Sequence, residues 1–318
     1  MHAKHFLSLF ALVLLSLAPA YAAKLPVQTV KFSEHKPGYE VDLNYPRTGH
    51  QAIDLAIETW ARSLAKDFVE GVKSGETTSP TGMQSLELNF EIQRNDGRMF
   101  SVLFTDYSFT GGAHPNSVFE AFNFLLPDGA RVELAELFTR KGIERISAIS
   151  IAVLTKELGG PDGMTDTDWI KRGAGPNPRN FSNFALRPKE LALYFDAYQV
   201  AAYAAGPQEV HIPLSKLRGT LRADPRVPAA SFDCGQAQSD IEHAICGDRE
   251  LARLDRHVAE SYFDKLSWAP DEEKRFALRR DQRAWLITRD GCRVRAESFV
   301  GCLTGVYQAR LKALAATP

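Results

Sequence analysis

Cysteine is scarce in this sequence, and none precedes Cys234. Net charge is also nearly absent, because 38 Lys and Arg residues against 39 Asp and Glu residues leave −1. Nucleic-acid-binding proteins have an excess of positive charge that attracts phosphate groups. This chain has none, so nucleic acid is not an expected partner. No repeat of fixed period and no low-complexity tract occurs. With 318 residues, 44% of them hydrophobic, the sequence predicts a folded protein of about two domains.

Signatures of catalysis are lacking as well. The sequence contains no G-x-S-x-G elbow, no H-E-x-x-H helix and no P-loop. It also has no C-x-x-C pair and no histidine at metal-ligand spacing from a cysteine. The sequence therefore predicts a protein that is not an enzyme and that uses no metal and no cofactor.

One long apolar run is present, from Phe6 to Leu17. It is followed by Ala20-Tyr21-Ala22, which has the small-x-small pattern of a signal peptidase site. The run is shorter than the roughly 20 residues that a membrane span needs. We therefore expect residues 1–22 to be a cleaved signal peptide, with a retained anchor as the alternative. The mature chain would begin at Ala23 in the periplasm and would not be bound to the membrane.

The cysteines cluster near the C-terminus, at Cys234, Cys246, Cys292 and Cys302. In an oxidising compartment an even number of cysteines is typical of disulfide bonds. Four cysteines allow three pairings. We favour Cys234 with Cys246 and Cys292 with Cys302, because each pair closes a short local loop.

A linker is indicated between these cysteines and the rest of the chain. Residues 222–231 contain two prolines and three alanines and show no apolar period. The sequence therefore predicts a first domain over residues 23–221 and a second over residues 232–318.

Two periodicities alternate in the first domain. A stripe of apolar residues at steps of three and four predicts a helix over residues 49–73; it consists of Ile53, Ile57, Trp60, Leu64 and Phe68. Leu86 to Ile92 then alternate with polar residues, which predicts a half-exposed strand. Asn95-Asp96-Gly97 favours a hairpin turn into a strand that begins at Phe100.

A second hairpin is indicated at Pro127-Asp128-Gly129, and another helix over residues 143–158. This order predicts an α+β domain in which helices pack on one face of an antiparallel sheet.

An unusual connection lies within this meander, from Tyr107 to Asn116. Gly111 and Gly112 permit backbone angles that are closed to other residues. His114 could tie the loop to the sheet or contact a partner; for catalysis it would need an orienting carboxylate, and no motif supplies one. The candidate partner-binding residues are Tyr107, Gly111, Gly112, His114 and Asn116.

The run Tyr107 to Asn116, followed by the Asp128-Gly129 turn, resembles the extracytoplasmic domain of the anti-sigma factor RsiV. The stretch from Leu191 to Leu217 is similar to the end of that domain. This resemblance implies lysozyme binding, and related domains accompany polysaccharide deacetylases. A cleaved signal in place of a membrane helix means that sigma-factor control is not implied. No deacetylase array of aspartate and histidine is visible, so that reaction is not implied either.

The second domain is predicted to be all-helical. Ser239 and Glu242 form a capping box, and Asp248 can cap a longer helix that ends at Pro270. A third helix is expected from about Asp271 and a fourth from Glu297. A domain of this size is marginally stable on its core alone, which is a physical reason for disulfides.

This pattern resembles the lysozyme inhibitor LprI-like family. The residues that carry the resemblance are Phe232, Asp233, Cys234, Ser239, Glu242, Ile245, Cys246, Leu251, Leu254, Asp255, Tyr262, Gln282, Trp285, Leu286, Arg289, Cys292, Cys302, Leu303, Tyr307, Arg310 and Leu311. Within it, Asp255 and Arg289 are expected to pair and hold the helices in register, with contact to a partner as the alternative.

Two dissimilar domains thus each resemble a lysozyme-linked family. The leading hypothesis is a periplasmic protein that binds lysozyme and inhibits it by occluding the active-site cleft, with the His114 loop as the first candidate contact. The alternative is an accessory protein that binds peptidoglycan or another envelope glycan without catalysing a reaction. In that case Tyr107, Tyr198 and Tyr203 would stack on sugar rings.

Overall fold

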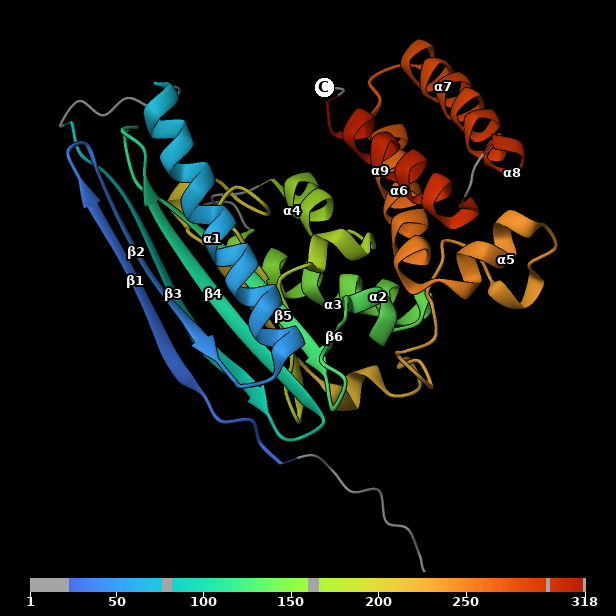
Figure 1. Ribbon diagram of the computed structural model, residues 1–318. Helices are drawn as coiled ribbons and strands as arrows, with labels where there is room; N and C mark the ends of the chain where they lie inside the picture. Colours follow the sequence, from blue (N-terminus) through green and yellow to red (C-terminus); the bar gives the residue numbers. More distant parts are fainter. Residues whose placement is uncertain (1–22, 76–81, 160–165, 296–297, 317–318) are drawn as a thin grey trace, which may run out of the picture.

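The computed structural model describes residues 23–75, 82–159, 166–295 and 298–316 (Figure 1). The predicted signal peptide and the predicted helix start at Glu297 lie outside these residues. In the described ranges no helix combines the length and the apolar character needed to cross a membrane.

A six-stranded sheet forms the first part of the chain. Its strands follow one another in space as in sequence: β1 (Gln28–Lys36), β2 (Tyr39–Arg47), β3 (Gln84–Asn95), β4 (Met99–Phe109), β5 (Asn116–Leu125) and β6 (Ala130–Arg131). Neighbouring strands are antiparallel except β2 and β3, which are parallel because α1 (Gln51–Ser74) connects them. The predicted first helix and the predicted hairpin at Gly97, where φ is 77°, are confirmed. Strands β1 and β2 were not predicted.

Helix α1 covers one face of this sheet (Figure 1). Ile53 and Ile57 are fully buried there, and the Trp60 ring lies 4.8 Å from Phe104 and 5.2 Å from Phe122. These helix residues belong to the predicted stripe, so the apolar period of the sequence marks the buried side of α1.

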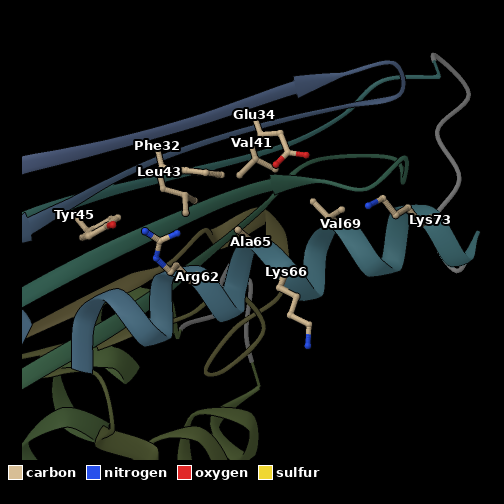
Figure 2. Close-up of a pocket in the computed structure, with 10 residues that line it drawn as sticks. All are labelled: Phe32, Glu34, Val41, Leu43, Tyr45, Arg62, Ala65, Lys66, Val69 and Lys73. Atoms are coloured by element: carbon tan, nitrogen blue, oxygen red, sulfur yellow. The ribbon is translucent and has the colours of Figure 1, made fainter. Parts of the chain in front are cut away.

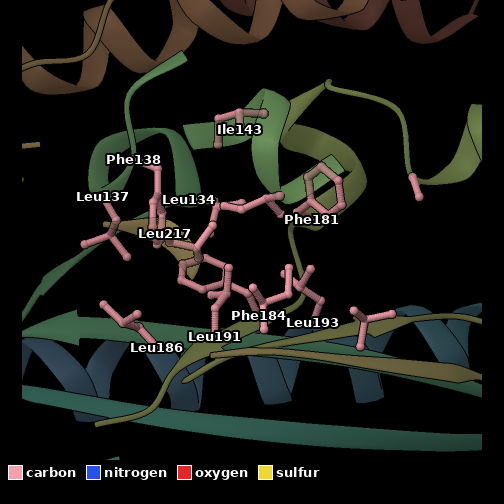
Figure 3. Close-up of a cluster of buried hydrophobic side chains, with 14 of the residues drawn as sticks. Leu134, Leu137, Phe138, Ile143, Phe181, Phe184, Leu186, Leu191, Leu193 and Leu217 are labelled. Carbon is pink, nitrogen blue, oxygen red and sulfur yellow. The ribbon is translucent and has the colours of Figure 1, made fainter. Parts of the chain in front are cut away.

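A second sheet covers the opposite face. It consists of β7 (Phe184–Leu186), β8 (Glu190–Phe195) and β9 (Gln208–Pro213), all antiparallel. On its far side lie α2 (Leu134–Leu137), α3 (Arg140–Leu158) and α4 (Thr167–Gly173). Figure 3 shows the core between these layers, in which Phe138 and Ile143 of the helical side face Leu191 and Leu193 of the sheet. The α+β fold is confirmed, and the second sheet is an addition that was not predicted.

The C-terminal region is all-helical, as predicted. Its helices are α5 (Asp240–Gly247), α6 (Arg249–Trp268), α7 (Glu272–Asp290), α8 (Cys292–Arg295) and α9 (Phe299–Ala316). Cys234 is bonded to Cys246 and Cys292 to Cys302, which confirms the predicted pairing. The capping box of Ser239 and Glu242 is present at the start of α5.

The predicted pair of Asp255 and Arg289 is wrong. The carboxylate of Asp255 accepts hydrogen bonds from the Tyr307 hydroxyl at 2.9 Å and from the Ser231 amide at 2.8 Å. Arg289 instead binds Asp290 at 2.8 Å and forms a hydrogen bond with Tyr307. The Tyr307 hydroxyl contacts both residues and comes between them.

Ion pairs join the C-terminal helices to the first region. Arg253 of α6 lies 3.0 Å from Glu136, whose side chain is 1% exposed. Glu133, which precedes α2, binds Arg256 at 2.5 Å and His257 at 2.8 Å. We call these five residues the docking network.

The segment over residues 222–231, predicted as a linker, contacts both regions. Arg226 binds Asp128 of the first region at 3.1 Å, and Arg256 of α6 donates to the carbonyl of Ala229 at 2.5 Å. The segment therefore lies along the junction that the docking network stabilises.

Candidate functional site

The predicted partner-binding loop connects β4 and β5. Ser108 and Asn116 form the last pair of the two strands, and Phe109 still pairs with Ser85 of β3, so the loop beyond the sheet spans residues 110–115. Gly111 adopts φ 95°, where an L side chain is strained, and this position requires glycine. Gly112 has no positive φ, so the expected need for glycine holds at only one of the two positions.

His114 stacks on Tyr203. The ring centroids lie 3.6 Å apart with an interplanar angle of 18°. The Tyr203 hydroxyl donates to the Pro115 carbonyl at 2.6 Å, and Nδ1 of His114 lies 3.0 Å from the same oxygen. The loop is thereby fixed to the segment that carries Tyr203. The expected tie of His114 to the sheet is not among its described contacts, because Nδ1 faces Pro115 of the same loop and the ring stacks on Tyr203.

Tyr198 extends this stack, with its ring 5.6 Å from that of Tyr203. Its backbone has φ 68°, an unusual value for a residue with a side chain, and its carbonyl accepts from Nε1 of Trp169 at 2.9 Å. The Tyr198 side chain is 53% exposed and His114 is also exposed. We call His114, Tyr198 and Tyr203 the aromatic shelf.

The structure thus joins residues that the sequence suggested for two different roles. His114 was predicted as a protein contact, whereas Tyr198 and Tyr203 were predicted to stack on sugars. Tyr107 is 44% exposed on β4 and makes no ring contact with the shelf in the described ranges. Asn116 is exposed at the start of β5.

Asp106 was missed at the sequence level. Burial raises the pKa of its carboxyl to about 6, and Oδ1 is buried without a hydrogen-bond partner. The alternation of the strand could have predicted this burial, because it puts Asp106 on the same face as Phe104, which is fully buried under α1. It therefore lies on the opposite face of the sheet from its neighbour Tyr107.

A groove under α1 was also missed (Figure 2). It encloses about 250 Å³ between α1 and strands β1 and β2. We call it the α1 groove; it is lined by Phe32, Glu34, Val41, Leu43, Tyr45, Arg62, Ala65, Lys66, Val69 and Lys73. No sequence motif marks it, since half of its wall comes from the two strands that were not predicted.

The described part of the chain holds no group of three or more His, Cys, Asp and Glu side chains arranged to bind a metal ion. His114 has no carboxylate among its described contacts.

Three family models match separate segments of the chain. Residues 32–117 match "Deacetylase PdaC", residues 135–215 match a protein family of unknown function, DUF3298, and residues 233–314 match "Lysozyme inhibitor LprI". The last match confirms the resemblance of the C-terminal region and includes all four cysteines.

Curated relatives match over part of their length. Peptidoglycan-N-acetylmuramic acid deacetylase PdaC of Bacillus subtilis is 28% identical over 182 residues, which are 57% of this chain and 38% of that protein. Lipoprotein LprI of Mycobacterium tuberculosis is 29% identical over 85 residues, 27% of this chain and 41% of that protein. The chain thus spans less than half the length of either relative.

Among solved structures, a DUF3298 family protein of Pseudomonas aeruginosa aligns with a TM-score of 0.50 at 18% identity. The alignment covers 63% of this chain and 96% of that one. At this identity the likeness concerns the fold alone. The chain is therefore similar to PdaC and DUF3298 proteins in its sheet-containing part and to the lysozyme inhibitor LprI in its helical part.

Proposed function

We propose that this chain is an exported protein that binds lysozyme and inhibits it by occluding the active-site cleft. The observation that carries the proposal is the match of residues 233–314 to the lysozyme inhibitor family, which spans both disulfides. The disulfides suit an oxidising compartment such as the periplasm. The resemblance of the first region to lysozyme-binding RsiV domains points to the same partner.

Occlusion needs a projecting group that suits the lysozyme cleft. A lysozyme cleaves its glycan with two carboxyl groups that flank the glycosidic bond. His114 projects such a donor, because its ring is exposed and Nε2 has no partner among the described residues. Stacking on Tyr203 holds the ring in place, so little side-chain entropy would be lost on binding.

The His114 loop cannot be the entire contact. A standard interface buries about 1,600 Å² in total. The helical region, held to the first region by the docking network, supplies the remaining surface in this proposal.

The test uses the full-length oxidised protein with a panel of lysozymes and purified peptidoglycan. We expect excess protein to stop glycan hydrolysis, and His114→Ala to weaken binding by about tenfold, equivalent to about 1.4 kcal/mol. His211→Ala is the matched control, because His211 is exposed on β9 and contacts only Glu190 and Glu209 among the described residues. Unchanged hydrolysis with every lysozyme of the panel would contradict the proposal.

A second candidate function is binding of an envelope glycan, and the aromatic shelf favours it. The exposed rings of His114 and Tyr198, which flank the half-buried ring of Tyr203, offer flat apolar faces against which sugar rings could pack. Retention of the protein on purified sacculi, lost in Tyr198→Ala, together with no effect on lysozyme, would support this function over inhibition.

A further inference from the structure

The α1 groove has apolar walls from both sides. Val41, Leu43 and Tyr45 of β2 form its floor, and Ala65 and Val69 of α1 face them (Figure 2). Their side chains already pack in the core beneath the helix, so the groove is a depression in that core rather than a gap between loosely packed parts. Its walls would favour an apolar ligand body.

One wall of the groove lies at the edge of the sheet. Among the described strands β1 pairs only with β2, and Phe32 and Glu34 of β1 line the outer wall. Phe32 is only partly buried. A ligand could therefore enter from the side of β1 without any movement of α1.

Positive charge dominates the helix side of the groove. Arg62 and Arg47 share one carboxylate, that of Glu58, at 2.8 Å and 3.8 Å. Lys73, at the far end, has no ion-pair partner in the described ranges. The wall carries one acid, Glu34, which accepts a hydrogen bond from the Tyr39 hydroxyl at 2.5 Å.

Arg62 is the cation best placed to hold an anion. Figure 2 shows its guanidinium extending from α1 toward the strands, whereas Lys66, one turn farther along, points away from them. Nε and Nη2 of Arg62 bind Glu58, which leaves Nη1 to donate. Arginine suits carboxylates because its planar donors match their geometry.

We propose that the α1 groove binds a small amphipathic carboxylate, with the apolar body against Leu43 and Val69 and the carboxylate at Arg62. The groove, at about 250 Å³, is smaller than the pockets of roughly 300–1,000 Å³ that hold drug-sized ligands. The body is therefore a short aliphatic chain or a small ring system. The sheet separates this site from β7 to β9, so it is independent of the proposed lysozyme contact.

The experiment measures binding of octanoate and 2-naphthoate to the full-length protein by calorimetry, with 1-octanol as the uncharged comparison. We expect saturable binding of at least one carboxylate and binding of octanol weaker by about fivefold or more. Arg62→Gln should weaken binding of the carboxylate by about fivefold and leave binding of octanol unchanged. Whether octanoate or 2-naphthoate binds tighter distinguishes an aliphatic from an aromatic body.

Two further variants separate binding in the groove from attraction by positive charge elsewhere on the protein. Ala65→Phe places a ring in the groove and should abolish binding; Ala65→Leu serves the same purpose with less added volume if the first variant does not fold. Arg140→Gln is the matched control, because it removes one positive charge from an exposed position on a helix that does not line the groove, where Arg140 pairs only with Glu144 among the described residues. It should change affinity by less than about twofold.

The proposal is overturned if neither carboxylate binds saturably, or if binding survives in a folded Ala65 variant. Equal affinity for octanoate and octanol would also overturn it. So would a dimer in sedimentation experiments that Ala65→Phe converts to a monomer, because the groove would then be occupied by a second copy. Each of these results is independent of whether the protein inhibits lysozyme.

Discussion

Among single residues, two carboxyl groups at the junction have pKa values shifted in opposite directions: Glu133, which contacts α6, and Glu260, which lies on it. Burial disfavours the charge of Glu133, but a hydrogen bond from His257 and the charges of Arg256 and Arg253 prevail and lower its pKa to about 2. For Glu260, burial prevails over the attraction of Arg256 and His257 and raises the pKa to about 7. Glu133 therefore stabilises the docked arrangement as a carboxylate, whereas Glu260 is stable there as a neutral acid.

Replacing Glu260 should change the pH dependence of stability. A carboxyl with a raised folded-state pKa binds its proton more tightly when folded, so its contribution to stability is lost as pH rises from about 4.5 through 7. Glu260→Gln stays neutral and should raise the free energy of unfolding at pH 8 by up to about 3 kcal/mol, with little effect at pH 4. Denaturant unfolding at the two pH values measures this.

The control for this variant is Glu250→Gln, on the same helix with a side chain that is 60% exposed. It should show no such difference between the two pH values. Glu260→Gln could instead be less stable than the parent at pH 8. The ionised carboxylate would then stabilise the fold by pairing with Arg256, and Glu260 would not be a neutral acid there.

Among the elements, α1 depends on one apolar stripe. Ile57 is fully buried against the sheet, whereas Leu55 on the same helix is 65% exposed. We expect Ile57→Ala to lower the free energy of unfolding by about 2–5 kcal/mol, because it loses buried surface and leaves a cavity. Leu55→Ala should change it by less than about 0.5 kcal/mol. Equal losses for the two variants, measured by thermal unfolding, would mean that the stripe does not define the buried side.

The elements that periodicity predicted have one buried and one exposed face, although β2, which alternates in the same way, was not among them. Periodicity found α1 and the β3–β4 hairpin, because a face in water alternates with a face in the core. It missed β8, in which Leu191 to Phe195 are all buried and no alternation exists to be read. Strand β1 was missed because it lies at the edge of the sheet, where none of its residues is buried.

The candidate site was predictable only in part, for a related reason. Glycine and proline marked the His114 loop as a special connection. Its partner Tyr203, whose hydroxyl bonds to a residue 88 positions earlier, is brought there by the second sheet. Contacts over such distances depend on topology, which local patterns do not encode.

At the scale of the whole molecule, the docking network joins two regions that match unrelated families. Its buried member, Glu136, is paired with Arg253 and Arg249. Arg253→Leu would leave this buried carboxylate with one of its two cationic partners. We expect a loss of about 3–5 kcal/mol in stability, seen in calorimetry as a lower or divided unfolding transition.

Arg275→Leu is the corresponding control, since Arg275 pairs with Glu272 on the exposed surface of α7. Its effect should stay below about 1 kcal/mol. A similar loss in both variants would show that the buried pair does not hold the regions together.

The two disulfides have a consequence for how the chain matures. Each bond joins cysteines that follow directly in sequence, separated by 12 and 10 positions. A polypeptide that meets an oxidant in N-to-C order would present Cys234 and Cys246 together before Cys292 emerges. Correct connectivity is then also the first that forms, and maturation should need an oxidase but no isomerase to reshuffle mispaired thiols.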